Sequence, residues 1–332
     1  MPLDPSAKRL LDIFAAGGMV DVASISPQQM REGYRRLARS VDIKHVAVES
    51  VANGFLPGPD GPLPYRLYRA RPGIVPALVF FHGGGCVFGD LETHDGMCRM
   101  LSAASGCAVI AIDYRRAPEH RFPAALDDCF AATRWVADHA REHALDPARI
   151  AVGGDSSGAA LAAVICQMAR ADHGPRIALQ VLFCPVMDMR PATPSRRQLA
   201  EGFFLNQATI DWMLQHCCGP VACATEIDLG DPRLSPLRAA DFSRLPPAHI
   251  HTAEFDPLRD EGEAYAQALR RAGVGARYTC HAGMIHHFYA MAGAIPAART
   301  AVEAAAATMG QALGAHTVAA TPDALANAAG LP

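Results

Sequence analysis

Residues 150–161 read IAVGGDSSGAAL, and this stretch decides the fold expected for the whole chain. The apolar run Ile150 to Val152 has the character of a buried strand, and Ala159 to Arg170 has that of a helix. Between them, Gly154, Ser156 and Gly158 form a Gly-x-Ser-x-Gly pattern, which in this setting is typical of a nucleophile elbow. A serine at such a turn needs strained backbone, and the two glycines leave room where strand and helix cross. The pattern predicts Ser156 as a nucleophile, although an ordinary Gly-Ser turn has the same signature.

Short apolar runs alternate with helical stretches on both sides of this turn, as is typical of parallel strands covered on both faces. The runs span residues 77–81, 108–112, 150–152, 177–183, 249–253 and 277–280. Upstream, strand-like segments over Lys44 to Val51 and Pro64 to Arg69 are separated by Asn53-Gly54 and by the turn-rich residues 57–62. We therefore predict an α/β-hydrolase fold, with a mostly parallel central sheet flanked by helices and an antiparallel hairpin at one edge.

The chain divides into a catalytic domain with helical additions. Residues 1–43 hold two amphipathic patterns, around Leu10 and around Tyr34, and residues 44–313 form the α/β domain. Within that domain the alternation lapses around residues 187–222, where the helix-like stretch Gln207 to Gln215 stands among turn residues. We expect this insertion and the N-terminal helices to form a helical cap. The alanine-rich stretch Ala297 to Leu313 predicts a C-terminal helix. Residues 314–332 lack any pattern and are expected to be a disordered or loosely docked tail.

Composition narrows the class of partner. The 332 residues are 50% hydrophobic and 19% charged, which suits a large globular core. Thirty basic and 33 acidic residues give a formal net charge of -3, so no overall field attracts nucleic acid or an anionic membrane. Asp12 interrupts the N-terminal apolar stretch, which argues against a signal peptide. No run of about eighteen apolar residues occurs, which argues against a membrane-spanning helix. We expect a cytoplasmic protein, a monomer or homodimer, that acts on a small, weakly charged molecule.

Two arrangements resemble metal sites, and we predict a metal at neither. His139 to His143 matches the zinc-peptidase pattern H-x-x-E-H, but its mixed charges are expected on the solvated face of a helix. His216, Cys217, Cys218 and Cys223 contain no Cys-x-x-Cys pair and have no matching second pair downstream. Most of the ten cysteines lie in apolar segments and are expected to be buried free thiols.

A glycine-rich loop follows the first buried strand. His82 precedes three glycines, Gly83, Gly84 and Gly85, whose backbone N–H groups no side chain obstructs. Ester hydrolysis places negative charge on the former carbonyl oxygen, and one well-placed donor contributes about 2.7–4 kcal/mol of transition-state stabilisation. We predict the N–H groups of Gly83, Gly84 and Ser157 as an oxyanion hole, the alternative being a merely flexible loop.

An acid and a base follow the nucleophile in the order required for this fold. Asp256 ends a strand and is favoured over Asp260, because catalytic groups gather at the carboxyl ends of parallel strands. The base follows the last strand, where His286 competes with His287 and with His281. Spacing alone leaves the histidine open.

Between about Leu63 and Met291 the chain resembles the hormone-sensitive lipase family of bacterial carboxylesterases, also called family IV. Five blocks carry the resemblance: His82 to Gly85, Asp113 to His120, Gly154 to Gly158, Asp256 to Gly262 and Gly283 to Phe288. The resemblance assigns the base to His286. It leaves His287 where glycine is usual, Cys86 where an aromatic residue is common, and Arg116 where an apolar residue is common.

The resemblance implies a serine carboxylesterase that hydrolyses short to medium acyl esters through an acyl-enzyme, with neither metal nor organic cofactor. It also implies a pocket beneath a cap. The candidate pocket residues are Phe88, Phe203, Phe204, Leu205, Trp212 and Met213. Ordinary packing is the alternative for each of them.

Two other functions fit the same fold, because a fold does not fix a function. One is a hydrolase of lactones, carbamates or polyesters. The other is a small-molecule receptor, which the presence of Ser156, Asp256 and His286 together disfavours.

Overall fold

The computed structural model describes residues 2–17, 22–172, 174–190, 193–219 and 227–315. Its centre is an eight-stranded sheet in the order β1-β2-β4-β3-β5-β6-β7-β8. The strands are β1 (Ser50–Gly58), β2 (Gly61–Arg69), β3 (Val75–Phe81), β4 (Ala108–Ile112), β5 (Leu145–Asp155), β6 (Leu179–Phe183), β7 (Ala248–Phe255) and β8 (Ala276–Ile285). From β4 to β8 every pairing is parallel, while β1 and β2 are antiparallel, so the predicted sheet is confirmed.

The edge hairpin differs from the prediction. Strand β1 begins at Ser50 rather than Lys44, and the Asn53-Gly54 pair expected in the turn lies inside the strand. Gly54 pairs with Tyr65, and a Cβ at Gly54 would lie 2.7 Å from the tyrosine ring. The glycine therefore makes room for an aromatic ring on the neighbouring strand.

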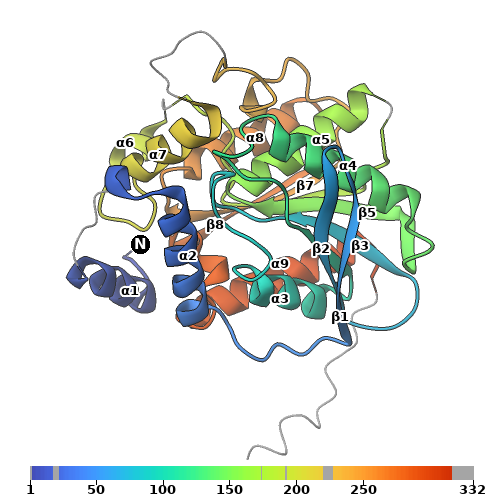
Figure 1. Cartoon of the computed structure of the whole chain (residues 1–332), viewed down its shortest axis with the longest axis horizontal. Coiled ribbons are helices and arrows are strands. Elements are labelled where there is room, and N and C mark those ends of the chain that lie inside the picture. Colours follow the sequence, from blue (N-terminus) through green and yellow to red (C-terminus); the bar gives the residue numbers. More distant parts are fainter. Residues whose placement is uncertain (1, 18–21, 173, 191–192, 220–226, 316–332) are drawn as a thin grey trace, which may run out of the picture.

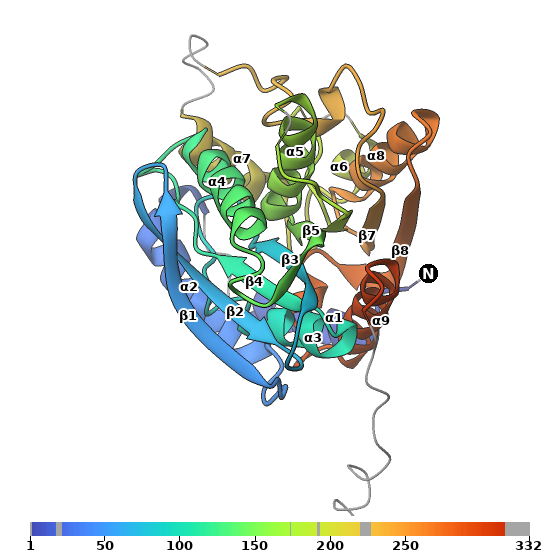
Figure 2. The same cartoon turned by 90° about the vertical axis from the view of Figure 1, so that its right-hand side faces the viewer.

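Helices cover both faces of the sheet, and Figure 2 shows the sheet between them. Helices α4 (Ala124–Asp138), α5 (Ser157–Ala171) and α8 (Arg259–Arg271) cover one face, and α3 (Asp95–Ser105) and α9 (Pro296–Ala312) cover the other. Successive side chains of β3 point to opposite faces, so Val79 packs beneath α4 and α5 while Phe80 packs against α3 and α9. The central strands are consequently buried on both sides.

Four outer helices, α1 (Pro5–Ala16), α2 (Pro27–Val41), α6 (Pro194–Gln198) and α7 (Gln207–Cys218), gather on one side of the molecule (Figure 1). The Trp212 indole N–H of α7 donates to the carbonyl oxygen of Ile25 at 3.2 Å, which joins the two groups of outer helices. Short 3-10 turns occur at Val22–Ser24, Pro236–Arg238 and Phe288–Ala290. The predicted tail lies outside the described residues beyond Ala315.

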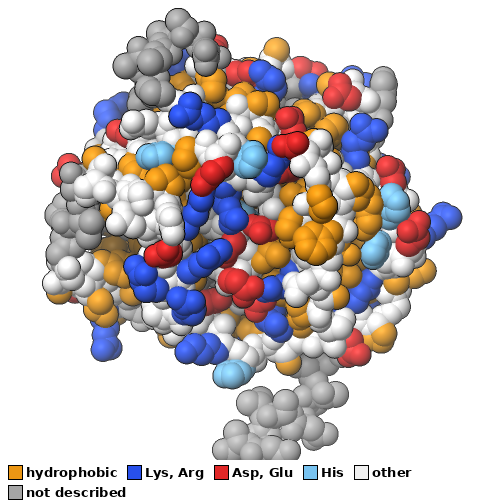
Figure 3. Space-filling model, in the orientation of Figure 1, with side chains coloured by type: hydrophobic (Ala, Val, Ile, Leu, Met, Phe, Trp, Pro, Cys, Tyr) orange, Lys and Arg blue, Asp and Glu red, His pale blue; other side chains and the backbone are white. Residues whose placement is uncertain are grey.

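On the face in Figure 3, basic and acidic side chains are interspersed. Within the described ranges, no helix has both the length and the apolar character needed to cross a bilayer. The segment His139 to His143 is not helical, contrary to the prediction, because α4 ends at Asp138 and turns follow. The His139 ring stacks on Trp135 at a centroid distance of 4.7 Å.

Candidate active site

Ser156 lies at the tight turn between β5 and α5. Its backbone has φ +53° and ψ -117°, a strained conformation for a residue with a side chain, and its N–H donates to the carbonyl oxygen of Phe183 at 2.8 Å. A Cβ on Gly154 would lie 2.2 Å from the Phe81 carbonyl oxygen, and one on Gly158 would lie 2.0 Å from the same atom. The two glycines therefore permit the crossing of strand and helix, as predicted.

An imidazole and a carboxylate meet at the carboxyl ends of β7 and β8. His286 Nδ1 lies 2.8 Å from Asp256 Oδ2, and both side chains are buried. The other carboxylate oxygen, Oδ1, accepts the Leu258 N–H at 2.9 Å, which fixes its orientation. Ser156 and His286 line the same pocket.

The competing candidates have other partners. Asp260 Oδ2 accepts the N–H of Ser195 at 2.8 Å, and Oδ1 of Asp260 pairs with Arg259. His281 Nε2 lies 3.2 Å from Nδ1 of His251. The structure thus brings together the acid and the histidine that strand position and family resemblance favoured.

The glycine loop differs from the prediction at Gly83. Its N–H donates to Asp155 Oδ1 at 2.8 Å, so this donor is already used inside the protein and the prediction of Gly83 as an oxyanion donor is wrong. The N–H groups of Gly84 and Gly85 have no acceptor within the described part of the chain. Gly85 and Ser157 line one pocket at Ser156, and Gly84 lines the other.

Comparison with known proteins agrees with this geometry. A family model described as alpha/beta hydrolase fold matches residues 78–290. The chain belongs to the α/β-hydrolase fold family. The resemblance to the hormone-sensitive lipase family is confirmed.

Relatives of this α/β-hydrolase are named as esterases. The carboxylic ester hydrolase LipN of Mycobacterium tuberculosis is 41% identical over 86% of this chain and 77% of its own length. The esterase LipI of the same organism is 37% identical over 90% of this chain and 92% of its own. An ester hydrolase from the metagenome of Lake Arreo, solved with a derivative of bipyridine phosphonate, is 42% identical. It has a TM-score of 0.90 and covers 94% of this chain and 99% of its own.

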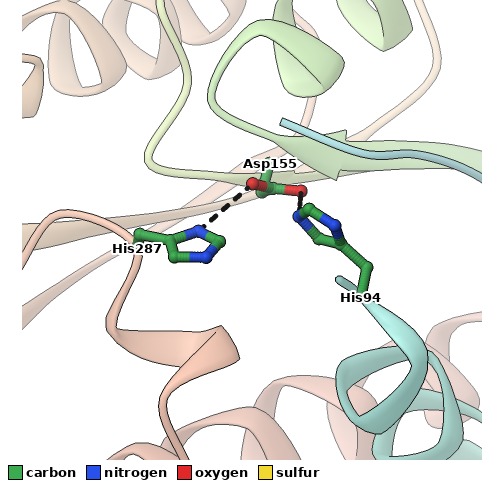
Figure 4. Close-up of side chains that lie close together, drawn as sticks. All are labelled: His94, Asp155 and His287. Carbon is green, nitrogen blue, oxygen red and sulfur yellow. Dashed lines mark ion pairs between the residues drawn. The ribbon is translucent and has the colours of Figure 1, made fainter. Parts of the chain in front are cut away.

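A buried cluster, His94, Asp155 and His287, lies beside the nucleophile of this α/β-hydrolase (Figure 4). Asp155 Oδ1 lies 3.2 Å from His94 Nε2, and Asp155 Oδ2 lies 3.6 Å from His287 Nδ1. Burial raises the pKa of Asp155, but the two histidines outweigh it and hold the pKa well below its usual range. Burial lowers the pKa of His94, yet Asp155 outweighs that effect and the pKa is raised. Asp155 is therefore ionised and favours the charged form of His94.

His287 extends this cluster to helix α2. Its Nε2 lies 2.6 Å from the Tyr34 hydroxyl, and its φ of +66° explains why glycine is usual at this position. Burial raises the pKa of Tyr34 well above its usual value, so its hydroxyl keeps its proton and donates. Burial also lowers the pKa of His287, which favours neutral imidazole. Sequence reasoning missed His94 and Tyr34, because no local spacing relates them to Asp155.

Two pockets meet at Ser156. The apolar pocket is lined by Gly85, Ser156, Ser157, Arg196 and mainly apolar side chains that include Leu161, Val186, Leu205, Ile210 and Met213. The tyrosine pocket is lined by residues that include Tyr34, Gly84, Phe88, Ser156, Phe204, Leu205, Met213, His286 and His287. Four of the six predicted pocket residues, Phe88, Phe204, Leu205 and Met213, line one or both of these pockets.

The predictions of Phe203 and Trp212 as pocket residues are wrong. Phe203 stacks on Phe255 with ring centroids 5.3 Å apart, and Trp212 packs in a cluster with Tyr34 and bonds Ile25. Neither lines either pocket at Ser156. Cys86 does line the apolar pocket, whereas Arg116 pairs with Asp113.

Two buried groups have the residue types of metal sites. One is His94, Asp155 and His287, and the other is Cys184, Asp256 and His286, each with its ligand atoms within 4.8 Å of one another. The ion pairs and the hydrogen bond described above already join the histidines of both groups to the carboxylates. Among the described residues, no such group includes His139, Glu142 or His143.

Proposed function

We propose that this carboxylic ester hydrolase cleaves short to medium acyl esters with Ser156 as nucleophile, His286 as general base and Asp256 as its partner. The single observation that carries this proposal is the buried 2.8 Å contact between His286 Nδ1 and Asp256 Oδ2, beside a pocket that Ser156 also lines. This is the arrangement in which a carboxylate holds an imidazole with its other nitrogen free to act as a base.

The chemistry then follows two half-reactions. Asp256 accepts a hydrogen bond from His286 Nδ1–H, which leaves Nε2 to take the proton of Ser156 as the serine oxygen attacks the ester carbonyl. The protonated imidazole, stabilised by Asp256, passes its proton to the departing alcohol. Water next attacks the acyl-enzyme with the same base and releases the acid.

We infer that the N–H groups of Gly84, Gly85 and Ser157 bind the oxyanion. The N–H groups of Gly84 and Gly85 lack acceptors among the described residues. Gly84 lines the tyrosine pocket, and Gly85 and Ser157 line the apolar pocket, beside Ser156 in each case. Gly83 serves instead to fasten the loop to Asp155. Each donor is expected to contribute about 2.7–4 kcal/mol to transition-state stabilisation.

The two pockets are proposed to receive the two halves of the ester. His286 must protonate the leaving alcohol, so the alcohol lies on the side that His286 lines, in the tyrosine pocket. The acyl chain then enters the apolar pocket, which His286 does not line. The outer helices supply walls of both pockets and act as the cap. A relative named ethyl acetate hydrolase, from Pseudomonas putida, is 34% identical over 88% of this chain and supports small substrates.

The test uses p-nitrophenyl butyrate. We expect a burst of p-nitrophenol that is lost in Ser156→Ala and after treatment with a serine-directed phosphonate, while the control Ser40→Ala keeps normal turnover. Esters of two to twelve acyl carbons then measure the depth of the apolar pocket. Normal turnover by Ser156→Ala would refute the proposed nucleophile, and a preference for the longest chains would refute the substrate class.

A further inference from the structure

The mainly apolar pocket at Ser156 has a buried charged side chain, Arg196, among its lining residues. Arg196 belongs to α6 and is only 3% exposed, yet it lines the same pocket as Ser156. Arginine is rarely buried to this extent without partners for its donors. What those donors contact therefore decides what this part of the pocket can bind.

The Arg196 guanidinium has partners for two of its three nitrogens. Nε donates to Glu261 Oε1 at 2.7 Å, and Nη2 donates to the carbonyl oxygen of Asp188 at 3.3 Å. Nη1 is buried and has no acceptor among the described residues. A buried donor without an acceptor carries a free-energy cost, which a bound oxygen atom would remove.

The surroundings select the charge of that oxygen. Glu261 is 1% exposed, and its Oε2 accepts the N–H groups of Met187 at 2.8 Å and Asp188 at 3.0 Å. The carboxylate is therefore fixed in place and balances the charge of Arg196. A second carboxylate, from a substrate, would be buried without a matching cation, whereas a neutral carbonyl oxygen needs only the hydrogen bond.

Arg233 also lines the apolar pocket but differs in its environment. Its side chain is 56% exposed, and its Nε and Nη2 pair with Asp231 at 2.6–3.2 Å. Water solvates such a group in the free enzyme, so it has no unmet need for an acceptor. Of the two arginines, Arg196 is the one whose free donor gains from a ligand.

We propose that Arg196 selects the substrate: its Nη1 donates a hydrogen bond to a neutral oxygen on the acyl chain. The preferred substrates are then esters whose acyl chain carries a keto or second ester carbonyl, rather than plain alkyl esters of the same size. This inference rests on the proposed function of Ser156 and on the placement of the acyl chain in the apolar pocket.

The test compares p-nitrophenyl esters in matched pairs. In each pair an oxo group on the acyl chain is replaced by a methyl of similar size: 4-oxopentanoate with 4-methylpentanoate, 5-oxohexanoate with 5-methylhexanoate, and 6-oxoheptanoate with 6-methylheptanoate. Each kcat/KM is divided by the rate of alkaline hydrolysis of the same ester, which removes differences in intrinsic reactivity. At one chain length or more we expect the wild type to favour the oxo ester roughly 10-fold or more, as for a hydrogen bond to a charged donor.

Variants of Arg196 distinguish a role in substrate selection from a role in supporting the structure of the pocket. Arg196→Met should lose the oxo preference and favour the methyl ester, as an apolar pocket does. Because this change leaves the buried Glu261 carboxylate without its cation, the double variant Arg196→Met with Glu261→Gln is measured as well. Arg299→Met, on the exposed face of α9, is the control and should keep the wild-type ratio.

Two outcomes would overturn the inference: a wild type that favours the methyl ester at every length, or variants that slow both esters equally and leave their ratio unchanged. Failure of the proposed function looks different, because neither ester of any pair would then be cleaved through Ser156.

Discussion

Replacing Asp155 with Asn should weaken catalysis without touching the proposed triad. The wild-type carboxylate accepts the Gly83 N–H at 2.8 Å and lies 3.2 Å from His94 Nε2, with no exposure to solvent. Asn keeps the size of the side chain but removes its charge. The bond to Gly83 then becomes a neutral one, about half as strong, and the ion pair with His94 is lost.

The size of the effect follows from these contacts. Losing one partner of a buried pair costs up to about 3–5 kcal/mol, but His94 can release its proton, so we expect the free energy of unfolding to fall by about 2–3 kcal/mol. The weaker bond between Gly83 and residue 155 then holds the loop that carries Gly84 and Gly85 less firmly in position. Complete loss of one oxyanion donor corresponds to about 10²–10³ in kcat, so a shifted loop should lower kcat by about 10–100-fold.

The assay is steady-state hydrolysis of p-nitrophenyl butyrate at a temperature where the variant is fully folded, with urea unfolding measured in parallel. We expect kcat to fall while KM changes little, because the loop contacts the transition state more closely than the bound ester. The comparison variant is His287→Gly, which removes the longer 3.6 Å contact but leaves the bond from Gly83 to Asp155, and should lower kcat by less than about 5-fold. An Asp155→Asn variant that loses stability but keeps wild-type kcat would refute the coupling of this carboxylate to the oxyanion hole.

Four further outcomes are expected. His286→Ala should lower kcat by about 10³-fold or more, far beyond the loss expected for His287→Gly, and the reverse order would reassign the base. Tyr34→Phe and His287→Gly should each destabilise the protein by about 1 kcal/mol and act non-additively in urea unfolding, since both remove one hydrogen bond. Burial raises the pKa of Asp42 to about 6, so this group's stabilising contribution is complete below pH 3.8 and is lost as pH rises through 6. Asp42→Asn should therefore gain about 1–3 kcal/mol relative to wild type between pH 4 and 7, and equal pH profiles would contradict this. Gly158→Ala should yield little folded protein on gel filtration, because its Cβ would lie 2.0 Å from a carbonyl oxygen of β3.

The parts of the fold that the sequence predicts well are those with strong local patterns. Strand β4 has the bounds expected from its apolar run, Ala108 to Ile112, and the C-terminal helix lies within one residue of its predicted ends. The predicted position of the edge hairpin was wrong because Gly54 is required by a contact with a distant residue rather than by a turn. Its small size serves Tyr65 on another strand, and glycine followed by proline-rich sequence otherwise indicates a turn.

The candidate site divides in the same way. Ser156 stands in a pattern whose spacing reflects a single turn, so the sequence alone could indicate it. Gly83 was misassigned because its N–H is used by the side chain of Asp155, 72 residues away, and no spacing rule relates the two. Trp212 was misassigned because its helix shows that it is buried but not which neighbour buries it.

The bond between Trp212 and Ile25 joins residues that lie 187 positions apart. The tyrosine pocket therefore depends on two distant regions of the chain, because Tyr34 of α2 and Met213 of α7 both line it. Chimeras with related enzymes would have to exchange α2 and α7 as a pair. If α7 alone were exchanged, the incoming helix would place a different side chain, or a differently oriented indole, opposite the unchanged Ile25 carbonyl. A change in substrate range could then result from the lost contact between the helices rather than from the substrate specificity of the donor enzyme.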